Sequence, residues 1–126
     1  MGLCTAEQVG CFEHEDDGRF AQALQEWFDK PGPKTGVFAN NDLWALRTLR
    51  ALRELRIDVP GQAGVIGFDN ISMDRYLQPS LSSVSQPIAQ MAAEAVDRLM
   101  YRIDHPEAPE RLDRPLPATL VLREST

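Results

Sequence analysis

Two kinds of hydrophobic pattern alternate along the chain, and they predict strands and helices in turn. Three short apolar runs, bounded by glycine, proline or polar residues, predict strands over residues 36–39, 64–68 and 81–85. Three stretches whose apolar residues recur every three or four positions predict helices over residues 19–29, 43–56 and 88–103. The tail alternates around Leu120 and Leu122, which predicts a last strand.

The order of these elements predicts the fold class. A strand at 36–39, a helix at 43–56 and a strand at 64–68 form the βαβ unit of a parallel sheet with a right-handed crossover. We therefore expect an α/β fold. The leucines of the middle helix should face the sheet, and they are Leu46, Leu49, Leu52 and Leu55.

The strongest helical pattern lies in residues 88–103, directly after Pro87, which suits a first helical turn. Its apolar residues follow the spacing of one wide helical face. They are Ile88, Met91, Ala92, Ala95, Val96, Leu99, Met100 and Ile103.

Polar side chains follow two of the predicted strands, where open α/β sheets bind small molecules. Asn40, Asn41 and Asp42 come after the first strand, and Asp69 and Asn70 come after the second. A carboxylate that accepts hydroxyl groups, beside an amide that donates and accepts, suits a sugar or another polyol. We expect Asp42 to be the N-cap of the helix that follows it.

Aromatic side chains near such a site would stack on the apolar face of the ligand or belong to the core. Three aromatic residues stand at suitable positions for either role: Phe12, Trp44 and Phe68.

Catalytic signatures are missing from the sequence. It has no nucleophile elbow, no phosphate-binding glycine loop and no zinc-ligand spacing, so we expect neither an enzyme nor a bound cofactor. Asp42 and Asp69 could form an acid/base pair at the strand ends, but a helix cap explains Asp42 better, and a binding site also needs a carboxylate. The acidic run 13–17 contains His14, but a helix start explains it better than a metal site.

Charge and composition narrow the function classes further. The chain has 126 residues, 43% of them hydrophobic, and a net charge of -6, which argues against a dominant contact with nucleic-acid phosphates. Arginines recur every three residues in the middle helix, a spacing that drifts around a helix and indicates a solvated face. We see no secretion signal and no membrane-spanning run, and we expect a cytoplasmic protein in which Cys4 and Cys11 are free thiols.

Several motifs, in this order and spacing, resemble the LacI/GalR family of bacterial transcription repressors. They are residues 37–42 (VFANND), Val59-Pro60, residues 65–70 (VIGFDN), residues 76–84 (YLQPSLSSV), Gln86-Pro87 and residues 122–126 (LREST). The resemblance runs from about Gly18 to Thr126. It implies the carboxyl-terminal part of an effector-binding domain with Rossmann-like subdomains and the fold of type I periplasmic sugar-binding proteins, incomplete at the N-terminus.

The resemblance also implies roles for individual residues. Asn41 and Asp69 would bind the effector. An aromatic residue that stacks on the ligand would stand five positions before the glycine that opens the first helix; Glu13 occupies that position here, and Phe12 takes the role if the loop is shifted by one. Leu46, Tyr76 and Leu77 would lie in a dimer interface.

The resemblance further implies a partner for the last helix. Residues 88–103 would pack on a first subdomain that this chain does not encode, so we expect a truncated domain that forms a homodimer or a higher oligomer. DNA would be bound only through a helix-turn-helix absent from this chain, and regulation by a small sugar-like effector is the implied function. The alternative is a periplasmic-type solute-binding protein, which predicts a secretion signal upstream where the regulator predicts a helix-turn-helix.

Overall fold

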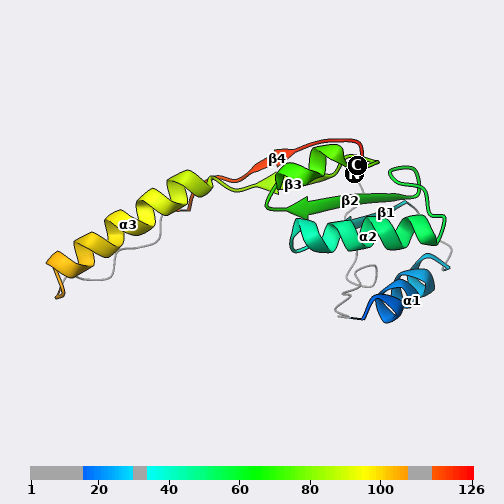
Figure 1. The fold of residues 1–126 in the computed structure, drawn as a ribbon, viewed down its shortest axis with the longest axis horizontal. Coiled ribbons are helices and arrows are strands. Elements are labelled where there is room, and N and C mark those ends of the chain that lie inside the picture. Colours follow the sequence, from blue (N-terminus) through cyan, green and yellow to red (C-terminus); the bar gives the residue numbers. More distant parts are fainter. Residues whose placement is uncertain (1–15, 30–33, 108–114) are drawn as a thin grey trace.

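The computed structural model describes residues 16–29, 34–107 and 115–126 (Figure 1). Their elements are α1 (Asp17–Phe28), β1 (Thr35–Phe38), α2 (Asp42–Glu54), β2 (Ala63–Phe68), the 3₁₀ helix η2 (Ser72–Tyr76), β3 (Ser82–Ser85), α3 (Ile88–Asp104) and β4 (Thr119–Val121). Each helix and strand predicted within the described residues is present, with ends shifted by at most two residues.

The strands form one sheet in the order β1-β2-β3-β4. The first three strands are parallel, and β4 pairs with β3 in the antiparallel direction. This confirms the expected α/β fold with a mainly parallel sheet.

Helix α2 packs on the sheet, and α1 packs on the outer side of α2 (Figure 1). The core between α2 and the sheet includes Leu52, Val65 and Leu81. Of the four leucines expected to point inward, Leu52 is fully buried, and Leu49 and Leu55 are half-buried and pack against the hydrophobic clusters. Leu46 is half-buried. After Asp42, the buried residues of α2 are Ala45, Thr48, Ala51 and Leu52. Small side chains at three of these positions let the helix approach its neighbours closely.

Helix α1 begins where the acidic run ends. Asp16 is its N-cap, and its Oδ1 accepts a hydrogen bond of 2.9 Å from the backbone N–H of Arg19. Phe20 and Leu24 are the buried residues of α1 and pack with Ala51 of α2. The helix-start interpretation is therefore confirmed for Asp16, whereas residues 13–15 lie outside the described residues.

The last residues of the chain fill a position between β2 and β3. Ser125 is fully buried. Its Oγ donates to the carbonyl oxygen of Val65 at 2.6 Å and accepts from the N–H of Ser82 at 2.8 Å. Its own N–H and carbonyl bond to Ser80 and Val65. The tail thus joins two neighbouring strands ahead of their first pairing, Ile66 with Ser82.

Helix α3 projects away from the body formed by the other elements (Figure 1). None of its residues is buried. Its large apolar side chains are exposed by 41 to 62%, and they are Ile88, Met91, Val96, Leu99, Met100 and Ile103. Within the described ranges, no helix has both the length and the apolar character that crossing a membrane requires.

Two arginines of α2, Arg47 and Arg50, form ion pairs within this chain. Arg47 forms an ion pair of 2.7 Å with Asp17 of α1, and its guanidinium lies 4.0 Å from the ring centroid of Trp44. Arg50 pairs with Glu54 one turn later at 2.9 Å. These contacts agree with a solvated, internally paired face.

Candidate functional site at the carboxyl ends of the strands

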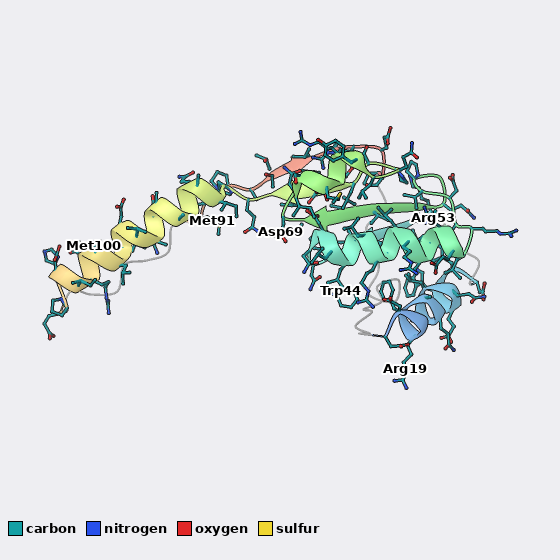
Figure 2. All side chains as sticks on the ribbon, in the orientation of Figure 1. Arg19, Trp44, Arg53, Asp69, Met91 and Met100 are labelled. Carbon is teal, nitrogen blue, oxygen red and sulfur yellow. The ribbon has the colours of Figure 1, made fainter. Side chains whose placement is uncertain are left out.

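The polar tips after β1 and β2 lie at one edge of the sheet, because the two strands are parallel and in register from Thr35 with Ala63 to Phe38 with Ile66. Asn41 follows β1, and Asp69 and Asn70 follow β2. Figure 2 shows Asp69 at the end of the sheet from which α3 projects. The predicted strand-end site is thus assembled from two neighbouring loops.

Asn41, and not Asp42, is the N-cap of α2. The Asn41 Oδ1 accepts a hydrogen bond of 2.9 Å from the backbone N–H of Trp44, and the Asn41 backbone is extended. The expectation for Asp42 is therefore wrong by one position. Asp42 is instead the first residue of the helix, and its side chain turns into the protein, where it is 1% exposed.

Asp69 is the exposed carboxylate of the site. Its φ of 114° turns the chain sharply away from the strand, and Asn70 follows with a φ of 52°. The Asp69 Oδ1 accepts a hydrogen bond of 2.9 Å from Nε2 of Gln86, just after β3. This contact orients the carboxylate while its side chain stays open to solvent.

Asn70 points inward and joins β2, β3 and the tail. Its backbone N–H donates to Oγ of Ser83 at 3.0 Å, and its Nδ2 donates to Oγ of Ser85 at 3.2 Å. Its Oδ1 accepts from the Arg123 guanidinium at 2.6 Å. Arg123 also donates to the carbonyl oxygen of Leu81. Sequence analysis did not identify Arg123 as a support for the site, because its position some 50 residues later shows no periodicity linking it to this edge.

A second carboxyl group stands behind the exposed edge. The sequence suggested pairing Asp42 with Asp69, but the carboxyl that the structure brings to Asp42 is that of Asp74, in η2. Asp74 is 0% exposed. Burial, followed by the neighbouring carboxyl of Asp42, raises the pKa of the Asp74 carboxyl from 3.8 to about 6. Sequence analysis did not single out Asp74, because an aspartate in a loop of polar residues carries no sign of burial.

The aromatic candidates differ in their surroundings. Trp44 packs edge-to-face on Phe20 with ring centroids 5.7 Å apart, and it contacts both hydrophobic clusters, which is the core role. Phe68 is half-buried at the end of β2. Phe12 lies outside the described residues.

The residues predicted for a dimer interface lie on two elements. Tyr76, at the end of η2, is 75% exposed. Leu77 is half-buried and packs against the core, and Leu46 is half-buried on α2. Their role in association stays a prediction.

Comparison with known proteins finds a matching domain family and related transcriptional regulators. The family described as "Periplasmic binding protein-like domain" matches residues 5–126. The HTH-type transcriptional regulator GalR of Escherichia coli K12 is 32% identical over 124 residues, which cover 98% of this chain and 36% of the relative. The HTH-type transcriptional repressor PurR of Vibrio vulnificus is 33% identical over 116 residues, or 92% of this chain and 34% of the relative.

Solved structures of transcriptional regulators share the fold. A complex of the transcriptional regulator CelR with cellobiose matches with a TM-score of 0.79 at 29% identity, over 98% of this chain and 38% of that one. A LacI family regulator of Enterococcus faecium with bound ribose matches with a TM-score of 0.68 at 35% identity, over 84% of this chain and 38% of that one. The chain thus spans about a third of the length of the curated relatives it matches.

Proposed function

Because this chain belongs to the periplasmic binding protein-like domain family, in the form found in LacI/GalR transcriptional regulators, we propose that it supplies part of an effector-binding and dimerisation domain. The whole protein would regulate transcription in response to a small sugar-like molecule. Its DNA contacts would come from a helix-turn-helix outside this chain. The compared relatives support regulation over solute transport, since they are named as transcriptional regulators.

One observation carries the proposal: an exposed carboxylate at the carboxyl edge of a parallel sheet, held by a neighbouring side chain. Asp69 is placed by the turn at the end of β2 and oriented by Gln86 at 2.9 Å. Such an acceptor matches the hydroxyl groups of a sugar, because an ionised carboxylate accepts hydrogen bonds from two hydroxyls at once. The relatives with bound ribose and cellobiose support this ligand class.

Asn41 and Phe12 complete the proposed effector contacts of this chain. Asn41 uses its Oδ1 to cap α2, so its Nδ2 is the group we assign to the ligand. Phe12 would stack on the apolar face of a sugar ring. We assign Leu46, Tyr76 and Leu77 to dimer contacts, and we propose that α3 packs on a part of the whole protein outside this chain.

Thermal unfolding of the intact gene product with ribose, cellobiose and related sugars tests the effector proposal. A ligand at a hundredfold excess over its Kd stabilises the folded state by about 2.7 kcal/mol. We expect one sugar to raise the melting temperature, and we expect Asp69→Ala to abolish that rise. Asp97→Ala, on the exposed polar face of α3, is the matched control and should leave it unchanged. A rise that survives Asp69→Ala would refute the assigned carboxylate, and no response to any sugar would refute the ligand class.

A further inference from the structure

Two buried carboxyl groups are neighbours, Asp42 at the start of α2 and Asp74 in η2. Asp42 is 1% exposed and Asp74 is 0% exposed, and the neighbouring Asp42 raises the pKa of the Asp74 carboxyl. Both residues are held to Ile71, because the Asp42 carboxylate accepts from the N–H of Ile71 and the N–H of Asp74 donates to the carbonyl oxygen of Ile71. Two ionised carboxylates in a buried site repel each other, and neither can donate a hydrogen bond. The two carboxyl groups can therefore form a hydrogen bond with each other only when one of them carries a proton.

The neighbours of each carboxyl group indicate which one carries the proton. Asp42 accepts from Oγ of Ser83 at 2.6 Å with one oxygen and from the N–H of Ile71 at 3.0 Å with the other. Both oxygens of Asp42 therefore act as acceptors, and neither is placed to donate a proton. Neither oxygen of Asp74 meets a donor among the described residues. The Arg123 guanidinium is 3.8 Å from Asp74 Oδ2 and donates instead to Asn70 and Leu81.

We propose that Asp74 is a neutral acid that donates its proton to the Asp42 carboxylate, and that this shared proton fastens the connection between β2 and β3 to the start of α2. The connection is anchored at Asp74 in two further ways. The N–H of Asp74 donates to the carbonyl of Ile71 at 3.2 Å, and its own carbonyl accepts from the N–H of Leu81 at 2.9 Å. The inference does not depend on the proposed effector function, because it uses only groups behind the exposed edge.

The charged groups around Asp74 come from three elements. Asp42 at the start of α2 and Asp69 after β2 both raise the pKa of Asp74, and burial raises it most. Arg123 beside β3 lowers it. The raising effects are larger, so the Asp74 carboxyl has a pKa of about 6 in the folded protein, whereas an unfolded aspartate has a pKa of 3.8.

The sign of the pH dependence follows from this difference. Below pH 3.8 the proton is bound in both states, and the stabilisation is fully present. Between pH 3.8 and about 6 the folded state holds a proton that the unfolded state has lost, so stability falls as pH rises through this range. Above pH 6 two negative charges face each other, and the segment 71–77 should open more often.

Carboxyl-carbon NMR of the chain labelled with ¹³C-aspartate measures the proton directly and needs no variant. We expect one aspartate resonance to titrate near pH 6, well above the ordinary aspartate value of about 3.9. Asp74→Asn should remove that resonance, and Asp97→Asn should keep it. If no aspartate of the wild-type chain titrates above pH 5, the shared proton is refuted.

Urea unfolding as a function of pH gives a second, independent readout. The asparagine of Asp74→Asn can donate to Asp42 at every pH, because it does not titrate. The wild type should lose stability from pH 4 to pH 7 and the variant should not. The urea midpoint of the variant minus that of the wild type should therefore rise over this range. The same difference for Asp97→Asn should stay flat. A flat difference for Asp74→Asn would overturn the proposal even if that resonance were found.

Discussion

At the scale of single residues, the start of α2 and the end of β2 meet with no room for an extra atom. A Cβ on Gly67 would stand 2.1 Å from Oδ1 of Asp42 and 3.2 Å from Cδ2 of Leu81. Asp42 cannot swing aside, since both of its oxygens hold hydrogen bonds inside the protein. The GFDN motif thus has a packing reason for its glycine as well as a proposed ligand role for its aspartate.

We expect Gly67→Ala to lower the free energy of unfolding by about 1–3 kcal/mol, the usual cost of overpacking a buried site. Gly61→Ala is the matched control, because a Cβ there would stand 2.0 Å from Oδ2 of Asp58, whose exposed side chain can rotate away. Urea unfolding monitored by tryptophan fluorescence measures both variants. Equal losses in the two variants would contradict the explanation by a fixed Asp42.

At the scale of elements, the body consists of three layers joined through α2. The inner side of α2 packs on the sheet around Leu52, and its other side packs on α1 through Ala51. Trp44 contacts both clusters, so α1 packs on the sheet indirectly, through α2. The candidate site depends on this arrangement, because Asn41 begins the same helix.

Leu24→Ala should therefore detach α1 partly from α2 and lower the free energy of unfolding by about 2–5 kcal/mol. Leu24 is 1% exposed, whereas Leu43 on α2 is 65% exposed and serves as the control for the same substitution. Leu43→Ala should change stability by less than about 0.5 kcal/mol. Chemical denaturation measures the free energy of unfolding of both variants. A loss in Leu24→Ala as small as that in Leu43→Ala would show that α1 contributes little to the fold.

At the scale of the whole molecule, α3 is the element that the rest of the chain leaves uncovered. Its apolar residues form one wide face, and all of its large ones are exposed. An apolar surface of this extent favours association in water. The physical state of the chain in solution therefore depends on what this face contacts.

We expect the 126-residue chain to be non-monomeric at micromolar concentration. Leu99→Lys with Ile103→Lys places two charges on the apolar face and should shift the chain toward the monomer. Gln90→Lys with Asp97→Asn raises the net charge by the same amount on the opposite side of α3 and should not. Size-exclusion chromatography with light scattering gives the masses, and a monomeric wild type would contradict the expectation.

The sequence by itself determined the elements, the fold class and the edge that holds the polar tips, because periodicity and turn residues are local properties of the chain. It also determined the family, through motifs whose order and spacing are preserved. The structure decided which side chain does what at that edge. Whether Asn41 or Asp42 caps α2 depends on a single backbone turn, and the burial of Asp74 and the contacts of Arg123 and Ser125 depend on segments that meet only after folding. Pairings between residues so far apart leave no periodic trace in a single sequence, so only the tertiary structure could reveal them.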